Sequence, residues 1–263
     1  MSTLELLHKG QCAIGVIHIP PFPTSFRKPS GSFEQLLDYC ERCAKRLESA
    51  GFDALLLQNV GDEPTHLAAP PETVAYMTLV GNKVRQAVSI PIGISLLNHD
   101  GKSPLAIAKA VGADFVRLKT YVGVMVKMTG LLSGCYYEAI KYRREIQAEN
   151  IALFADIFDR EGQPLGAIDL VEMAHFAEYS CMADALILTG RSKEETCQML
   201  HDVAKKVSIP LIVGGGVSNE SIGKLKVISK GFIVGAAVKE QEDDFSEISL
   251  EKATHLVASI KLS

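Results

Sequence analysis

The sequence predicts an α/β fold of the (β/α)8 type, a TIM barrel that occupies residues 1–263 as a single domain. Eight short runs rich in Val, Ile and Leu have the composition of parallel strands that are buried on both faces. Their ends advance by about 31 residues on average, which is the length of one strand–helix unit in a repeating chain. The runs are Cys12–Ile17, Asp53–Gln58, Pro91–Leu96, Asp114–Lys119, Ile151–Ile157, Asp184–Thr189, Pro210–Gly214 and Gly231–Gly235. No linker rich in Ser, Gly or Pro interrupts the repeat, which favours one closed barrel over the alternative, an open doubly wound sheet.

Helix start signals stand between the predicted strands. Ser32-Phe33-Glu34-Gln35 has the pattern of a capping box, and apolar residues recur after it at helical spacing. Ser192-Lys193-Glu194-Glu195 repeats this pattern before the seventh run. Ser103-Pro104 puts a proline in a first helical turn, where its missing N–H costs nothing. Ser218 is positioned to cap the next helix, and a helix over Leu250–Leu262 closes the chain.

The composition is that of an ordinary globular protein and narrows the classes of partner. Hydrophobic residues make up 47% and charged residues 22% of the chain. The net charge of −4 leaves no basic surplus to neutralise phosphates, so no nucleic-acid partner is expected. No apolar run reaches the ~18 residues of a membrane span, and Met1–Glu5 lacks the basic start of a signal peptide. We therefore expect a cytoplasmic protein with reduced cysteines, and association into a homo-oligomer stays open.

Two loops of small residues follow the seventh and eighth predicted strands. The first contains Gly215 and Gly216, and the second contains Gly235 and Ala236. Glycines let the backbone approach an anion closely, and the N-terminus of a following helix offers unpaired N–H groups. Loops at these two places often bind phosphate in βα barrels. We predict that these four residues form a phosphate site; the alternative is that they only make tight strand-to-helix turns.

Ionisable side chains stand where two other predicted strands end. Asp156 ends the fifth apolar run, and His18 follows the first. A carboxylate at the rim of a barrel suits acid–base chemistry or metal binding, and an imidazole can transfer protons near neutral pH. The alternatives are an aspartate that accepts backbone N–H bonds and a structural histidine. We take both residues as catalytic candidates.

Further polar residues complete the candidate site. Lys119 shares one side of the fourth strand with Arg117, where it either acts as an amine nucleophile or, more often, pairs with a carboxylate such as Asp156. Asp62 and Lys119 join the catalytic candidates, and the candidates for substrate binding are Asn59, Asp100 and Thr189. The sequence indicates no cofactor and no metal site.

Taken together, the strand-end segments resemble those of the BtpA family, also called SgcQ-like, in one order over about residues 10–240. The matching segments are His18–Pro23, Asn59–Asp62, Pro70–Val74, Ala106–Ala108, Gly112–Arg117, Gly130–Gly134, Tyr142–Arg144, Phe154–Asp156, Thr189–Gly190, Gly214–Val217 and Val234–Gly235. The resemblance implies a barrel of the ribulose-phosphate-binding type. It implies less about activity, because cyanobacterial members resemble stabilisers of photosystem I, whereas SgcQ-like members occur beside sugar-uptake genes in bacteria without photosynthesis.

This chain departs from the family pattern at positions on the rim. Gln58 stands where the family usually has glutamate, His99 where asparagine is usual, and Lys119 where asparagine is expected. Asp159-Arg160-Glu161 lies where a Lys-His pair normally follows the aspartate of the fifth strand. These differences weaken the inference of a catalytic mechanism shared with the family.

Two functions are consistent with these observations. The first is a barrel that binds a small phosphorylated metabolite, with a sugar phosphate as the leading candidate, and that carries out isomerase or lyase chemistry by proton transfer next to a carbonyl. The second is a non-catalytic assembly or regulatory factor, as the photosystem role of some family members suggests. The response of thermal stability to phosphorylated ligands separates the two.

Overall fold

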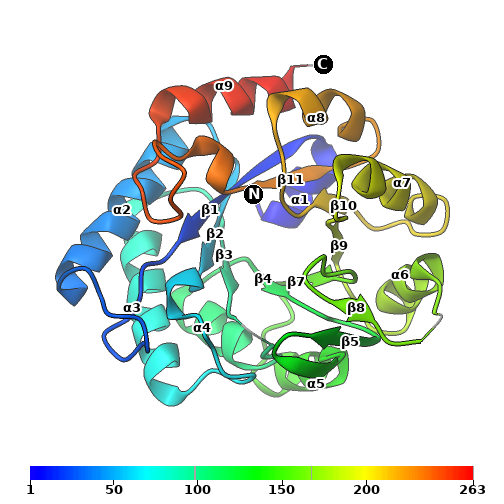
Figure 1. Ribbon diagram of the computed structural model, residues 1–263, viewed down its shortest axis with the longest axis horizontal. Coiled ribbons are helices and arrows are strands. Elements are labelled where there is room, and N and C mark those ends of the chain that lie inside the picture. The colour runs from blue at the N-terminus through cyan, green and yellow to red at the C-terminus, as the bar shows by residue number, and fades with distance from the viewer. Residues whose placement is uncertain (98, 167, 263) are drawn as a thin grey trace.

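The computed structural model describes residues 1–97, 99–166 and 168–262, and its centre is a closed barrel of parallel strands (Figure 1). The strand order around the barrel is β1-β11-β10-β9-β7-β4-β3-β2. The bounds are β1 Cys12–His18, β2 Ala54–Gln58, β3 Ile92–Ser95, β4 Phe115–Leu118, β7 Ala152–Asp156, β9 Ala185–Leu188, β10 Leu211–Val213 and β11 Gly231–Val234. Each strand overlaps one predicted apolar run. The prediction of a closed (β/α)8 barrel is therefore confirmed.

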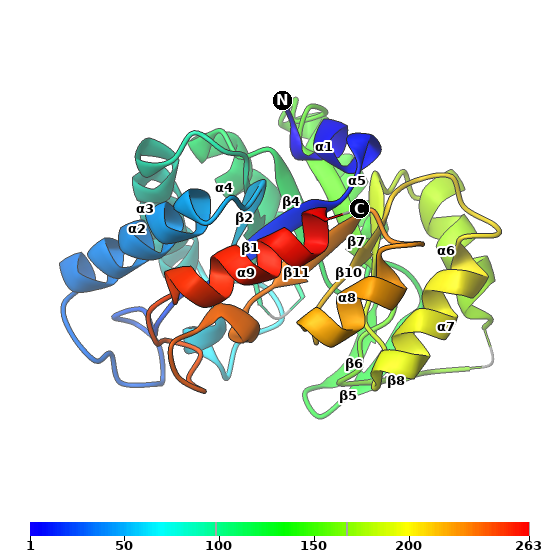
Figure 2. The same cartoon turned by 90° about the horizontal axis from the view of Figure 1, so that it is seen from above.

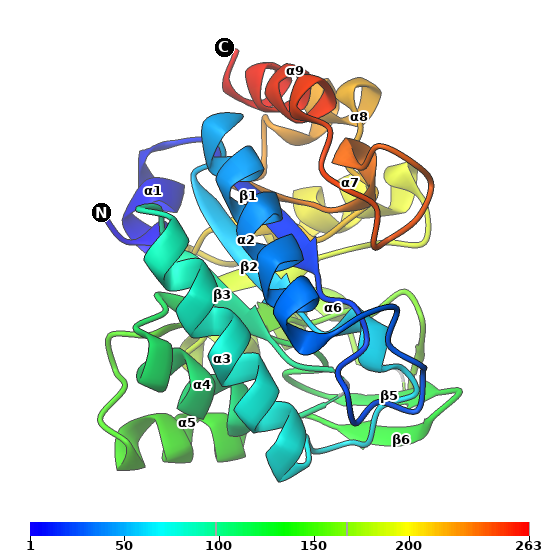
Figure 3. The ribbon, with the colours of Figure 1, turned by 90° about the vertical axis from the view of Figure 1, so that its left-hand side faces the viewer.

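Helices surround the strands, and Figure 3 shows α2 and α3 side by side on one flank. The bounds are α2 Phe33–Ser49, α3 Pro71–Ala87, α4 Ser103–Val111, α5 Tyr136–Glu145, α6 Leu170–Tyr179, α7 Lys193–Val203, α8 Asn219–Leu225 and α9 Leu250–Lys261. Ser32 forms the predicted capping box with Gln35, and the Ser192 hydroxyl accepts a hydrogen bond from the Glu195 amide. Ser218, which was predicted only to cap its helix, forms a capping box with Ser221. Within the described ranges, every helix is too short or too polar to cross a membrane.

A short helix that the sequence patterns did not predict, α1 (Thr3–Lys9), covers the amino-terminal end of the barrel (Figure 2). Its Leu7 is fully buried and belongs to the same apolar cluster as Cys12 and Ile14 of β1. Gly231 of β11 makes room for it, because a Cβ at that position would lie 2.6 Å from Leu7 Cδ2. The Leu7 side chain therefore packs into the amino-terminal end of the barrel interior.

Alternate side chains of each strand point into the barrel, and the inner layers are apolar. The apolar cluster that contains Leu7 also includes Ile14 and Val16 of β1, Phe115 of β4 and Phe154 of β7. The two phenylalanine rings stack with their centroids 4.5 Å apart. Gly93 of β3 leaves the space that they need, because a Cβ there would lie 2.3 Å from the Phe115 ring. Since side chains alternate along a strand, the next inward residue of each strand reaches the carboxyl-end mouth.

A small antiparallel sheet projects beside the carboxyl-end rim and was not predicted from the sequence. It consists of β5 (Val124–Lys127), β6 (Gly130–Ser133) and β8 (Gln163–Pro164), in the order β6-β5-β8. Figure 2 shows it at the end of the molecule opposite α1. The insertion adds side chains to the mouth from outside the barrel repeat.

Candidate functional site

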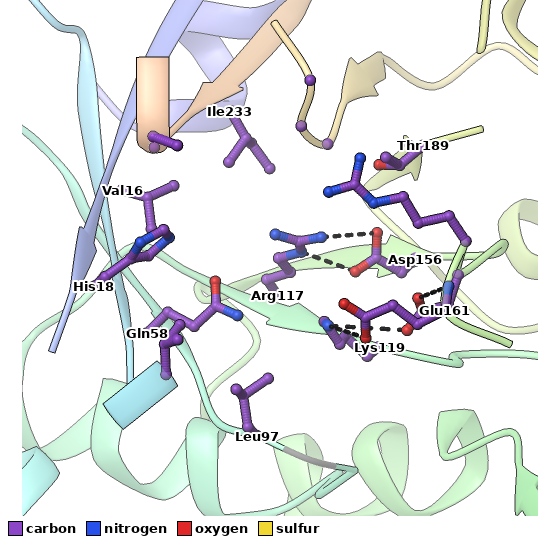
Figure 4. Close-up of a pocket in the computed structure, with 18 of the residues that line it drawn as sticks. Val16, His18, Gln58, Leu97, Arg117, Lys119, Asp156, Glu161, Thr189 and Ile233 are labelled. Carbon is purple, nitrogen blue, oxygen red and sulfur yellow. Dashed lines mark hydrogen bonds and ion pairs between the residues drawn. The ribbon is translucent and has the colours of Figure 1, made fainter. Parts of the chain in front are cut away.

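A cavity of about 360 Å³ opens at the carboxyl ends of the barrel strands (Figure 4). Its walls are the inward residues that follow the apolar layers: His18 follows Val16 in β1, and Asp156 follows Phe154 in β7. The inward residues that line it are His18, Gln58, Leu97, Arg117, Lys119, Asp156, Thr189, Gly214 and Gly235. Every barrel strand, or the loop directly after it, therefore contributes to one site, as expected for this fold.

An ion pair between Arg117 and Asp156 lies at the centre of the cavity floor (Figure 4). Arg117 Nε donates to one carboxylate oxygen of Asp156 at 2.8 Å, and its Nη2 lies 3.3 Å from the other. Both side chains are almost completely buried, and burial raises the pKa of Asp156 although Arg117 opposes the shift. The expected partner of Asp156 was Lys119, so that pairing was wrong. The planar guanidinium donates through two nitrogens to the two carboxylate oxygens, whereas the ammonium group of a lysine acts as a point charge.

Lys119 instead faces a second charge cluster on one wall of the cavity. Its Nζ lies 3.9 Å from Asp159 and 3.8 Å from Glu161. Lys127, at the end of β5, contacts the same Asp159 carboxylate directly. Burial acts to raise the pKa of Asp159, but the two lysines and the hydrogen bond from the Glu161 amide outweigh it and hold that pKa below its ordinary value. The added sheet therefore helps to fix the loop after β7 at the mouth.

His18 contacts a carboxylate from the opposite end of the sequence. Its Nδ1 lies 2.9 Å from Asp244 Oδ1, at the distance of an ion pair but without the alignment of a hydrogen bond. Gly235 makes space for the imidazole, because a Cβ there would lie 3.1 Å from His18 Nε2. The loop that carries Asp244 is anchored by Lys239, which is 2% exposed and donates to the Tyr39 hydroxyl at 2.8 Å. The acidic loop that contains Asp244 therefore reaches the site.

We expect Asp244→Asn to lower the pKa of His18. Burial already holds that pKa below its ordinary value, Lys239 and Arg117 act in the same direction, and the Asp244 carboxylate opposes them. Removal of this carboxylate takes away a stabilising charge from the imidazolium, so protonation shifts to lower pH. Titration of His18 by proton NMR measures the change, and Glu242→Gln removes one charge from the same loop as a control. Identical His18 curves in wild type and Asp244→Asn would show that the carboxylate does not act on the ring.

The two loops of small residues lie side by side, because β10 and β11 are neighbours in the barrel. All four predicted phosphate-binding residues line the cavity: Gly215, Gly216, Gly235 and Ala236. The backbone φ of Gly216 is +66°, a conformation that favours glycine. The Thr189 hydroxyl is buried beside this loop and has no hydrogen-bond partner in the described part of the chain. A buried hydroxyl without a partner is available to a ligand.

Three of the predicted site residues lie outside the lining of the cavity. Asp62 accepts hydrogen bonds from the Phe22 amide at 3.0 Å and from the Asn59 side chain at 3.3 Å. Asn59 in turn accepts from the Leu97 amide at 2.8 Å. Asp100 accepts from backbone amides of its own loop and from that of Ala69. These three side chains hold the loops of the rim in place. In the ranges that the structure describes, no three His, Cys, Asp or Glu side chains form a group that could hold a metal ion.

Several residues that line the cavity were not among the predicted site residues, although Gln58 and Arg160 were noted as rim positions. Arg117 was noted only as a neighbour of Lys119, although period-two alternation already places it inward. Gln58 could have been found in the same way, since it follows the inward Leu56 of β2. Arg160 and Asp244 also line the cavity, but they come from loops with no periodic signal.

Solved structures with the same architecture are enzymes of different kinds. Thiamine phosphate pyrophosphorylase from Pyrococcus furiosus matches with a TM-score of 0.59 and 17% identity, over 97% of this chain and 98% of that chain. A Schiff base-forming fructose-1,6-bisphosphate aldolase matches with a TM-score of 0.56 and 18% identity, over 98% and 99% of the two chains. At such low identity these matches show the fold alone.

Sequence relatives span nearly the whole chain. A Pyrococcus furiosus protein is 36% identical over 252 residues, which are 93% of this chain and 92% of the relative. The photosystem I biogenesis protein BtpA of Synechocystis is 32% identical over 245 residues, 91% of this chain and 84% of that protein. The model of the BtpA family matches residues 9–262. The resemblance in the strand-end segments is thereby confirmed, and the chain belongs to the BtpA family.

Proposed function

We propose that the barrel mouth binds a small phosphorylated metabolite, with a sugar phosphate as the leading candidate. The observation that carries the proposal is the convergence of two adjacent small-residue loops on the cavity that also contains His18, Arg117 and Asp156. The backbone of Gly215, Gly216, Gly235 and Ala236 would hold the phosphate, and the Thr189 hydroxyl would donate to the ligand. Two of the structures with the same fold are named for phosphorylated compounds, which supports this class of ligand.

The ionisable groups of the cavity suit proton transfer next to a carbonyl. His18, whose pKa burial holds low, is neutral near pH 7 and can accept a proton at Nε2. Arg117 uses Nε and Nη2 for Asp156, which leaves the N–H groups of Nη1 for an oxygen on which negative charge develops. Lys119, on the adjacent wall, supplies a second cation. This arrangement supports an isomerase or a lyase.

Ala236→Asp tests the proposal with a close control. The new carboxylate would stand in the mouth and repel a phosphate group, so we expect the affinity for phosphorylated ligands to fall at least about tenfold. Ala237 is also exposed but does not line the mouth, so Ala237→Asp should bind like the wild type. A thermal-shift screen of phosphorylated metabolites finds the ligand, and calorimetry then compares the three proteins. Equal affinity in wild type and Ala236→Asp would show that the loop of Gly235 and Ala236 does not bind the phosphate.

A non-catalytic assembly or regulatory role is the second candidate. The carboxylates of the cavity favour this role, because Asp156, Asp159 and Asp244 each contact a basic side chain. A carboxylate that is paired in this way has a structural role. One relative is named for photosystem I biogenesis, which is consistent with such a role. No stabilisation by any member of a broad panel of phosphorylated metabolites would favour this candidate over the first.

A further inference from the structure

A second cavity of about 180 Å³ adjoins the mouth on the side of β9. It lies between the loop that leads from β9 into α7 and the loop that leads from β10 into α8. We call it the side cavity; the residues that matter here are Arg160, Gly190, Arg191, Lys193, Gly215 and Gly216. Three of these, Arg160, Gly215 and Gly216, also line the mouth. The two cavities therefore meet at the first small-residue loop.

The two cavities differ in the charge of their walls. Besides His18, the mouth is lined by three Lys or Arg side chains and five carboxylates, namely Arg117, Lys119, Arg160, Glu63, Asp156, Asp159, Glu161 and Asp244. The side cavity is lined by Arg160, Arg191 and Lys193, and no carboxylate is among its described lining residues. An anion on the Gly215–Gly216 loop is thus attracted towards the side cavity and repelled from the Asp244 side of the mouth.

The three cations are held in different ways. Arg191 is fixed by donation to the Gly162 carbonyl at 3.1 Å and by stacking of its guanidinium 5.3 Å from the centre of the Phe158 ring. Lys193 donates to Ser218 Oγ at 3.2 Å and lies 3.3 Å from Glu220. Arg160 has no hydrogen bond or ion pair within the described residues. Its guanidinium is therefore free to bind an anion.

The first turn of α7 does not make this site by itself. The Glu195 carboxylate accepts from the Arg191 amide and lies 3.6 Å from its guanidinium, so a resident carboxylate already occupies the helix N-terminus. A ligand can therefore bind the unpaired guanidinium of Arg160, the remaining N–H donors of Arg191 and Lys193, and the glycine backbone. This is the chemistry of a phosphate dianion site.

We infer that the side cavity neutralises the phosphate of the ligand, with Arg160, Arg191 and Lys193 as its cations. The inference rests on the proposed function and extends it, because it orients the ligand. The phosphate lies on the β9 side of Gly215–Gly216, and the uncharged end of the molecule points towards Arg117 and His18. The ligand class is accordingly a phosphate monoester rather than a neutral sugar.

Inorganic phosphate is the probe, titrated into the full chain by calorimetry at constant ionic strength. Arg160→Gln removes a side chain without a partner and should leave the melting temperature unchanged, while it weakens phosphate binding about tenfold or more. Lys193→Gln should weaken it to a similar extent. Lys205→Gln, at an exposed lysine that pairs with Asp202 away from both cavities, is the control and should bind like the wild type.

The outcomes separate this inference from the proposed function. The inference that the side cavity binds phosphate is overturned if Arg160→Gln and Lys193→Gln both keep full phosphate affinity. It is also overturned if the wild type does not bind inorganic phosphate at millimolar concentration. If Ala236→Asp still weakens the binding of phosphorylated ligands in that case, the proposed function stands without a role for the side cavity. If the side-cavity variants bind phosphate more weakly and Ala236→Asp keeps its affinity for phosphorylated ligands, the side cavity is the phosphate site. The second small-residue loop is then excluded from that site.

Discussion

Arg117→Ala is expected to destabilise the folded protein by about 3–5 kcal/mol, because it leaves the buried Asp156 carboxylate without its counter-charge. The loss should be smaller at low pH. Burial raises the pKa of folded Asp156 and Arg117 opposes that rise, so removal of Arg117 raises this pKa further. As the pH falls, Asp156 of the variant becomes protonated and the uncompensated buried charge is lost. Urea unfolding at several pH values measures both the loss and its pH dependence.

The matched comparison for this variant is Lys119→Ala. Asp159 keeps its contact with Lys127 when Lys119 is removed, and the Lys119 contacts are long, at 3.8 and 3.9 Å. We therefore expect a much smaller loss, of about 1 kcal/mol or less. A double replacement of Arg117 by Met and Asp156 by Leu should recover most of the stability, because it removes both charges together. Equal losses in Arg117→Ala and Lys119→Ala would contradict the pairing described above.

Gly61→Ala is expected to cost about 3 kcal/mol and to displace the loop that begins at His18. Gly61 lies in a 3₁₀ turn over Val60–Asp62, and its amide donates to the Ile19 carbonyl at 2.9 Å. A Cβ at Gly61 would lie 2.3 Å from the backbone nitrogen of Pro21 and 2.4 Å from the carbonyl carbon of Pro20. Main-chain atoms of a proline pair cannot move aside as a flexible side chain can, so the two loops must separate.

Chemical unfolding and the NMR signal of His18 report on this variant together, because a displaced loop changes both. Gly223→Ala is the control, since Gly223 lies inside α8 and a Cβ there would meet no atom within 4 Å. That change should stabilise the protein slightly, by about 0.4–1 kcal/mol. A Gly61→Ala protein with wild-type stability and an unchanged His18 signal would refute the close packing of the two loops.

Much of the architecture could be predicted from the sequence because each unit of the barrel is specified locally. Apolar runs marked the strands, and the serines at positions 32, 192 and 218 marked where helices begin. Helix α1 and the sheet of β5, β6 and β8 escaped prediction, since short elements with mixed polarity have no clear period.

The sequence by itself determined the barrel and the places where its chemistry would lie, because strand ends and side-chain alternation are properties of consecutive residues. It located His18, Asp156, Thr189 and the two small-residue loops at one rim. Only the tertiary structure decided which side chains meet there. Arg117 rather than Lys119 holds Asp156, and Asp244 reaches His18 through a loop anchored by Lys239. Such pairings depend on barrel closure, side-chain reach and the path of irregular loops, and none of these leaves a periodic signal in the sequence.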